Sequence, residues 1–357
     1  MELETVCRHV DERIRRGAAL TMTVPAAIAG PLAAAPVLRT FSHGRNALLA
    51  ALQLCDLRAG DAVLLPGYIC QEVLAPVAAS GARALFYGVN EGLEPAQEWC
   101  DWPAARVVVA VNYFGFAQNL APFRQYCTRH GAVLIEDNAH GWLSREAGGE
   151  WLGLRGDLGI FSMHKTLRLI DGAALAVLRA DLAAHPPPQL PPRHLAMPVT
   201  LRVERWLAEL PGPLPLFWVR TMRREWRQWR SGSAVPPPSA RAETDMPSEA
   251  APHAGLQAAL DGFDAPTEVL RRRALYGEVH ARLAPFGVTP LWRDLPVGTA
   301  PYGYAFRAAA LAGHEKTVLV RAMRRMGLEV FLWPALPSAV APVAPAHYSN
   351  TWLVNFL

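Results

Sequence analysis

The alternation of helical and strand patterns between Gly44 and Leu178 constrains the fold of this chain more than any other feature. Apolar residues recur at three- or four-residue spacing in three segments, which predicts helices over Arg45–Cys55, Gln71–Ser80 and Leu120–His130. Short apolar or β-branched runs predict strands at Ala62–Leu65, Ala84–Tyr87, Arg106–Val111, Ala132–Glu136, Gly159–Ser162 and Ala174–Leu178. Buried parallel strands joined by crossover helices have this pattern, so an α/β domain with a mostly parallel sheet is expected.

Proline clusters at Pro186–Pro192 and Pro236–Pro238 divide the rest of the chain. After them, helical patterns at Leu256–Leu260 and Thr267–Leu283 precede a strand-like region and a further helix near Thr317–Met326. We therefore predict four parts: an N-terminal arm (residues 1–43), a large α/β domain (44–185), a Pro/Trp/Arg-rich linker with a helical insertion (186–252), and a smaller C-terminal α+β domain (253–357).

Charge and cysteine content exclude several classes of protein. The formal net charge is only +4 and basic residues gather in one stretch alone, near residues 220–230, so no nucleic-acid-binding surface is predicted. The five cysteines lie far apart and form no C-x-x-C pair, which argues against a disulfide framework and against a zinc site. No metal is predicted, and a reducing cytoplasm is the expected compartment.

Two segments have more than one interpretation. Residues 17–38 carry no charge and follow two arginines, as in an export signal, but their three prolines favour a buried N-terminal arm. Residues 200–230 combine four tryptophans with a run of arginines. Such a segment either makes a peripheral contact with an anionic membrane or packs as a helix pair on the domain or a neighbouring subunit, and we favour packing.

Lysine is scarce in a way that draws attention to one position. Of the 35 lysine and arginine residues, only Lys165 and Lys316 are lysines. Where arginine supplies nearly every surface cation, a remaining lysine is enriched for work that arginine cannot do, such as forming an imine through a deprotonated amine. Lys165 follows directly after a predicted strand, and is therefore a candidate catalytic residue.

Polar side chains follow two of the predicted buried strands. Asp137 ends the strand that begins at Ala132, and His140 lies three residues later. The next strand ends at Ser162, which precedes Lys165 by three residues. Functional groups in parallel sheets gather beyond the carboxyl ends of the strands, so these four side chains are expected to meet. The alternative is that Asp137 is a capping residue and His140 a hydrogen-bonded core histidine.

Together these residues match the needs of pyridoxal 5'-phosphate (PLP). That cofactor requires a lysine for its aldehyde, a carboxylate that keeps the pyridine nitrogen protonated, and a cradle for its phosphate. Lys165 and Asp137 supply the first two. Gly44, Arg45 and Asn46 open a helix, whose free N–H groups attract anions, although this stretch is also explained as a plain helix start.

Six segments resemble the DegT/DnrJ family of PLP-dependent sugar aminotransferases in order and spacing: Gly44–Leu48, Gly60–Pro66, Tyr113–Gly115, Glu136–His140, Gly156–Asp157 and Phe161–Ser162. The resemblance implies the aspartate-aminotransferase fold (fold type I), with a seven-stranded, mostly parallel central sheet flanked by helices. It also implies that Asp137 pairs with the pyridine nitrogen, that His140 lies near the phenolic oxygen, and that Ser162 and residues Gly44–Asn46 hold the phosphate. Lys165 would carry the cofactor as a Schiff base.

The chain departs from the family in ways that concern the site. In many members the lysine follows the serine by five positions, where this chain has Leu167. We expect Lys165 to take over at the shorter spacing, although relatives that dehydrate sugars carry histidine in place of the lysine, and His164 lies beside it. The ring-stacking aromatic is replaced by Cys70, which leaves Tyr68 as a candidate for that contact.

The resemblance implies a transferase that moves an amino group from an amino-acid donor such as glutamate to a keto sugar, in particular a nucleotide-linked one, or to a related carbonyl compound. A homodimer is the expected assembly, since fold-type-I enzymes build their sites between two subunits. The alternatives are a sugar dehydratase-like enzyme and a non-catalytic scaffold or binding protein on the same fold.

Overall fold

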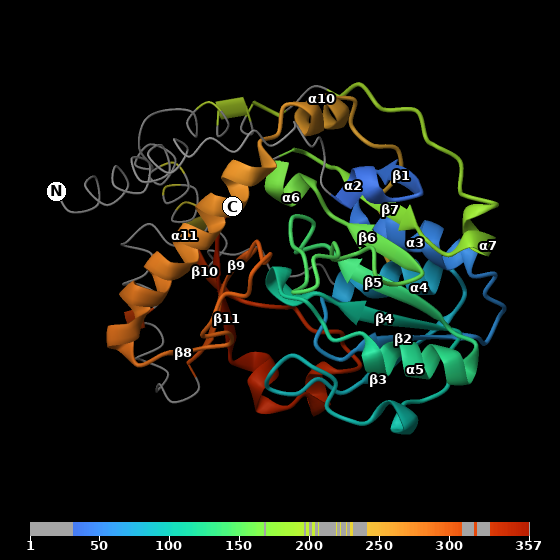
Figure 1. Ribbon diagram of the computed structural model, residues 1–357, viewed down its shortest axis with the longest axis horizontal. Coiled ribbons are helices and arrows are strands. Elements are labelled where there is room, and N and C mark those ends of the chain that lie inside the picture. Colours follow the sequence, from blue (N-terminus) through green and yellow to red (C-terminus); the bar gives the residue numbers. More distant parts are fainter. Residues whose placement is uncertain are drawn as a thin grey trace.

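A computed structural model describes residues 31–195 except 168, residues 241–308 and 329–356, and isolated positions between 198 and 230 and at 318–319. The predicted helix near Thr317–Met326 and most of the predicted insertion lie outside the described residues. The described part has two sheets, and Figure 1 shows them on opposite sides of the molecule. No helix among the described residues is long and apolar enough to cross a lipid bilayer.

The larger sheet has seven strands in the order β1-β7-β6-β5-β4-β2-β3. Their bounds are β1 (Val37–Phe41), β2 (Ala62–Pro66), β3 (Arg83–Tyr87), β4 (Val107–Val111), β5 (Val133–Asn138), β6 (Leu158–Phe161) and β7 (Ala173–Val177). Strand β7 runs in the opposite direction to the other strands, and all pairs that do not include β7 are parallel. The sheet is therefore mostly parallel, as predicted. Strands β2, β4, β6 and β7 are buried along their whole length, which is why they are continuous apolar runs.

Helices α3 (Gly44–Leu54), α4 (Leu74–Ala79), α5 (Ala121–His130) and α7 (Ala180–Ala183) flank this sheet, with a 3-10 turn at Gln71–Val73 before α4. Helix α5 ends at Gly131, whose φ of 61° is the left-handed conformation that glycine adopts without strain. A one-turn helix, α6 (His164–Leu167), follows β6 directly. The six predicted strands and three predicted helices are thus confirmed to within a few residues.

One strand of the large sheet was missed. Strand β1, together with the short helix α2 (Pro31–Ala34), lies in the stretch that we assigned to an N-terminal arm. β1 pairs with β7 from Val37–Val177 to Phe41–Ala173. The sheet therefore begins before residue 44, because β1 covers the open edge of β7 that would otherwise expose unpaired backbone groups.

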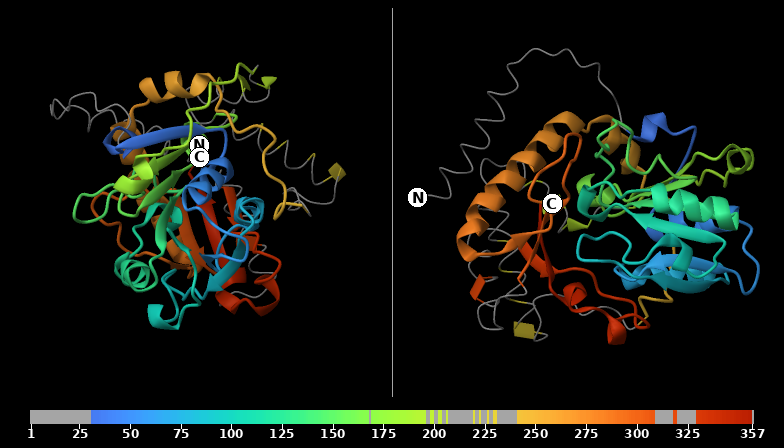
Figure 2. Two further views of the ribbon diagram at one scale, coloured as in Figure 1. Left: turned by 90° about the vertical axis from the view of Figure 1, so that its right-hand side faces the viewer. Right: turned by 60° about the horizontal axis from the view of Figure 1, so that its bottom comes forward.

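The smaller sheet has four strands in the order β10-β11-β9-β8 and is antiparallel throughout. Its strands are β8 (Thr289–Pro290), β9 (Gly303–Arg307), β10 (Glu329–Leu332) and β11 (Thr351–Asn355), and helices α10 (Gly255–Asp261) and α11 (Ala265–Leu283) precede them. Helix α11 begins at Asp264, whose carboxylate accepts a hydrogen bond from the Thr267 N–H at 3.1 Å. Figure 2 shows α11 lying along this sheet, on the side of the molecule away from α5.

Candidate active site

The predicted site residues gather where β5 and β6 end. These strands are adjacent and parallel, with Asp137 opposite Ile160 and Asn138 opposite Phe161. Asp137 therefore lies one strand away from the loop that carries Ser162 and from helix α6, which carries Lys165. The structure brings the acid, the hydroxyl and the amine to one edge of the sheet, as the strand pattern predicted.

Asp137 lies within electrostatic reach of the Lys165 amine. Its Oδ1 accepts a hydrogen bond from the Ala139 N–H at 3.0 Å. Burial raises the pKa of the Asp137 carboxyl above its ordinary value, while the Ala139 N–H and the positive charge of Lys165 act in the opposite direction. A second cation at this carboxylate would favour its charged form further.

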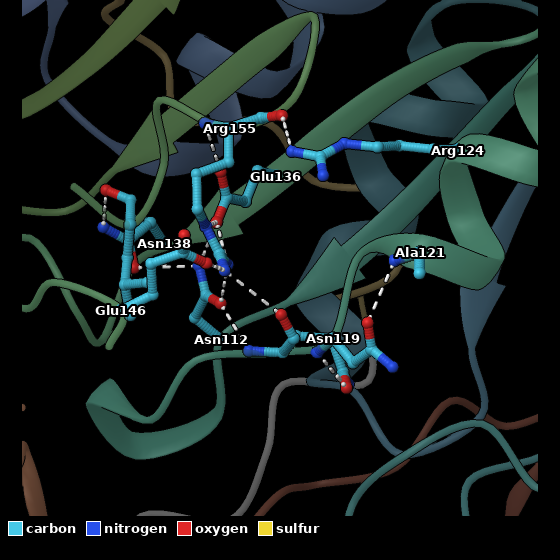
Figure 3. A network of polar contacts seen from close by, with 10 residues as sticks. Asn112, Asn119, Ala121, Arg124, Glu136, Asn138, Glu146 and Arg155 are labelled. Carbon is cyan, nitrogen blue, oxygen red and sulfur yellow. Dashed lines mark hydrogen bonds and ion pairs between the residues drawn. The ribbon is translucent and has the colours of Figure 1, made fainter. Parts of the chain in front are cut away.

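A buried polar network fixes the backbone on both sides of Asp137 (Figure 3). The Glu136 carboxylate is fully buried and accepts hydrogen bonds from Arg155 Nε at 2.9 Å and from the Arg155 N–H at 2.9 Å. The Asn112 amide bridges the two residues that flank Asp137, donating to Glu136 Oε1 at 2.8 Å and to Asn138 Oδ1 at 3.2 Å. Because side chains alternate along a strand, holding Glu136 and Asn138 on this side turns Asp137 to the other.

Lys165 lies on α6 with its Nζ 5.8 Å from the centre of the Tyr302 ring. Its positive charge opposes the rise in pKa that burial gives Asp137 and Cys70. For His140 the same charge adds to the lowering of the pKa by burial. Leu167, at the position where many relatives have lysine, packs instead against a core cluster that includes Met163 and Leu169. Lys165 is the one lysine among the residues that the structure describes, and it lies on α6 at this edge of the sheet.

His140 is held in a stack of aromatic rings. Its ring lies parallel to Tyr302 at 4.4 Å and to Phe114 at 5.6 Å, while Trp333 meets it edge-on at 5.3 Å. Burial and the charge of Lys165 hold the pKa of His140 well below its ordinary value, so the imidazole is neutral near pH 7. A neutral imidazole offers one N–H donor and one acceptor in a fixed plane.

The start of helix α3 lies beside the loop that follows β6. The Ser162 hydroxyl is 3.3 Å from His164 Nδ1, and the His164 ring meets the His43 ring edge-on at 5.9 Å. His43 precedes α3 and gives it no side-chain cap. Burial, together with the charge of Lys165, lowers the pKa of His164 to about 4. The hydroxyl of Ser162 and the first N–H groups of α3 thus form a surface suited to an anion.

The side chains of Arg45 and Asn46 have other partners. Arg45 Nη1 donates to the Asp245 carbonyl at 2.8 Å, and Asn46 Nδ2 donates to the Glu249 carbonyl at 3.0 Å. Both bonds tie the start of α3 to the segment that leads into the small domain. The backbone N–H groups of Gly44 and Arg45, rather than these side chains, are the groups that suit a phosphate.

Tyr68 lies among other aromatic side chains, and its contact with the cofactor ring stays a prediction. Its ring is fully buried against Tyr113, Trp333 and Tyr348, and its hydroxyl donates to the Trp333 carbonyl. Cys70 is the residue on which Lys165 and Asp137 act, and burial raises the pKa of its thiol to about 12. Of these two residues, Cys70 is thus the one whose pKa the charges of Lys165 and Asp137 affect.

Sequence reasoning missed the aromatic residues that surround His140. Phe114 was noted only as part of a motif, and Tyr302 and Trp333 lie more than 160 positions along the chain from His140. In the structure Phe114 has a φ of 54°, which is uncommon for a bulky residue and marks a sharp turn after β4, but this angle cannot be read from the sequence.

The residues present fit PLP in the tests that the structure allows. The acid and the amine lie on the same edge of the sheet, the start of α3 has no side-chain cap, and Ser162 lies near that start. Among the described residues, no cluster of three or more His, Cys, Asp or Glu side chains is arranged to hold a metal.

Comparison with known proteins agrees with this geometry. Residues 34–184 match the model of the DegT/DnrJ/EryC1/StrS aminotransferase family. The chain is 34% identical over 146 residues to L-glutamine:2-deoxy-scyllo-inosose aminotransferase of Streptomyces kanamyceticus, an alignment that covers 39% of this chain and 34% of that protein. It is 30% identical over 144 residues to dTDP-4-dehydro-2,3,6-trideoxy-D-glucose 4-aminotransferase of Saccharopolyspora spinosa, covering 39% and 37% of the two chains. The chain thus spans little more than a third of the length of these relatives.

The likeness in three dimensions extends further. A DegT DnrJ EryC1 StrS aminotransferase from Brucella abortus superposes with a TM-score of 0.60 over 99% of this chain and 90% of that one, at 17% sequence identity. At this identity the match speaks for the fold alone, and it confirms the fold-type-I architecture.

Proposed function

We propose, from the family match over residues 34–184, that this chain is a PLP-dependent aminotransferase that moves an amino group from an amino-acid donor to a keto sugar or a related carbonyl compound. The observation that carries the proposal is the placement of Lys165 and Asp137 at the ends of adjacent strands, with Ser162 beside them. When bound, PLP supplies an electron-withdrawing ring that stabilises negative charge at the carbon bearing the amino group.

Each residue has one task in this proposal. The Lys165 amine would hold the cofactor through its aldehyde, and as a free amine it would move a proton to and from the substrate carbon. Asp137 keeps the ring nitrogen protonated, and the positive charge there offsets the rise in pKa that burial gives the carboxyl. His140 donates a hydrogen bond from its neutral ring, and Ser162 with the first N–H groups of α3 binds the phosphate.

The donor and acceptor follow from the relatives only as classes. The names of two relatives specify L-glutamine and an inosose, and the name of a third specifies a dTDP-linked dehydro sugar without naming a donor. We propose glutamine or glutamate as the donor and a cyclic polyhydroxy ketone, free or nucleotide-linked, as the acceptor.

Histidine-based dehydration, with His164 in the role of the lysine, is less well supported. His164 Nδ1 lies 3.3 Å from both the Ser162 hydroxyl and the Gly172 carbonyl, so this nitrogen already has partners. A homodimer in the cytoplasm completes the proposal. The four described cysteines are free thiols, which supports a reducing compartment.

Reduction of the cofactor-loaded protein with borohydride tests the assignment directly. Purified protein incubated with PLP should absorb visible light, and borohydride should fix the cofactor to the peptide that contains Lys165. Lys165→Arg should abolish the half-reaction with glutamine or glutamate, and Lys316→Arg, which changes the only other lysine of the chain, should not. Absence of a labelled lysine in the unmodified protein would refute the proposal.

A further inference from the structure

The residue next to Lys165 is the meeting point of three distant segments. Thr166 Oγ1 accepts a hydrogen bond from Arg272 Nη2 of helix α11 at 2.8 Å, and another from Trp142 Nε1 of the β5–β6 connection at 3.0 Å. These donors lie 106 and 24 positions away in the sequence. One hydroxyl therefore joins helix α6, which carries Lys165, to helix α11 and to the β5–β6 connection.

Arg272 is an unusual residue for a helix that lies along the small sheet. Only 1% of its surface is exposed, and burial lowers the pKa of its guanidinium. Its Nε donates to Glu268 Oε1 at 2.6 Å, which leaves Nη2 free to reach Thr166. Burying a guanidinium is costly, and Glu268 already pairs with the more exposed Arg271 at 2.7 Å, so the ion pair alone does not account for the burial of Arg272.

Helix α6 needs an anchor of this kind. It has four residues, and a helix of one turn has little stability of its own. Inside it, Thr166 is held by the Trp142 and Arg272 donors, while the Nζ of Lys165 lies over the Tyr302 ring. Tyr302 also acts electrostatically on Arg272, so the anchor and the amine share this neighbour.

We propose that Thr166 is the positioning residue for Lys165, and that Arg272 transmits the position of helix α11 to it. The proposal rests on the function given above, since it explains how a lysine at the shorter spacing from Ser162 is fixed. It also implies that a movement of α11 displaces Lys165.

Variants of Thr166 test the first part. Thr166→Val keeps the shape but leaves the Arg272 and Trp142 donors unpaired, whereas Thr166→Ser keeps the hydroxyl. We expect the apparent dissociation constant for PLP to rise roughly tenfold in Thr166→Val, the scale of one hydrogen bond to a charged donor. In Thr166→Val the pH midpoint of the visible absorbance should also shift, and so should the fraction of Lys165 labelled after borohydride. Thr166→Ser should keep both at the values of the unmodified protein.

Arg272→Lys tests the second part. A lysine keeps the charge opposite Glu268 but lacks the fork that reaches Glu268 and Thr166 together, so it should shift the absorbance midpoint in the same direction as Thr166→Val. Thr128→Val is the matched control, since the exposed Thr128 hydroxyl donates only to the Arg124 carbonyl on α5. It should leave PLP binding and the midpoint unchanged.

The outcomes separate this inference from the proposed function. If Lys165 of the unmodified protein is not labelled, the proposed function fails. If it is labelled, and folded Thr166→Val matches the unmodified protein in labelling and midpoint, the positioning role is overturned while the function stands. Should Thr166→Val not fold, Arg272→Lys and Trp142→Phe carry the same comparison, and unchanged labelling and midpoint in both would overturn the role.

Discussion

Replacing Arg155 with methionine should destabilise the protein strongly, because it leaves the buried Glu136 carboxylate without its cationic partner. The Glu136 carboxylate has no exposed surface, and the Arg155 side chain donates to it from Nε at 2.9 Å and from Nη2 at 2.5 Å. Methionine fills similar space without a donor. The remaining partners of Glu136 are the Asn112 amide and one backbone N–H. Removing one member of a buried ion pair costs about 3–5 kcal/mol, so we expect the free energy of unfolding to fall by about that amount.

Urea unfolding followed by far-UV circular dichroism measures this difference. Arg124→Met is the matched control: Arg124 is exposed and donates to the Arg155 carbonyl at 3.1 Å, so its loss should cost less than about 1 kcal/mol. The double variant Glu136→Gln with Arg155→Met should recover part of the loss, because it no longer leaves a buried charge unpaired. A single Arg155→Met variant within 1 kcal/mol of the unmodified protein would refute the reasoning, since the carboxylate would then have found other partners.

Three further predictions follow from the site and its supports. Asp137→Asn should still bind PLP but slow the half-reaction with glutamine by about tenfold or more, and unchanged single-turnover rates would show that another acid serves the ring nitrogen. His164 has a pKa of about 4 in the folded protein against 6.5 in the unfolded chain, so the unfolded chain takes up a proton first and stability falls as the pH drops from 6.5 to 4. His164→Gln should reduce this fall by up to about 3 kcal/mol in urea unfolding at a series of pH values, and equal slopes would contradict the shift. Gly159→Ala would place a Cβ 1.8 Å from the Gly153 carbonyl oxygen, so it should lower the stability by at least about 2 kcal/mol, and a melting temperature equal to that of the unmodified protein would contradict the packing.

The features that the sequence predicted are those with a local signal. The continuous apolar run Val107–Val111 is a buried strand because all five side chains are covered, and the periodic run at α3 is a helix with one buried face. The positions of Asp137, Ser162 and Lys165 followed from these strands, because groups at the carboxyl ends of adjacent parallel strands lie together. The β1 strand escaped prediction because its residues are only partly buried and its pairing with β7 lies far along the chain.

The sequence by itself determined the large sheet and the edge at which its polar residues, Lys165 among them, gather. Only the tertiary structure decided what surrounds that lysine: Tyr302 and Trp333 around His140, the packing of Tyr68 against Trp333, and the Arg272 contact with Thr166. The reason is physical. Secondary structure follows from a periodicity that a short window of residues displays. A contact across 106 positions depends instead on how separately formed elements pack, and the sequence of either segment alone does not show that packing.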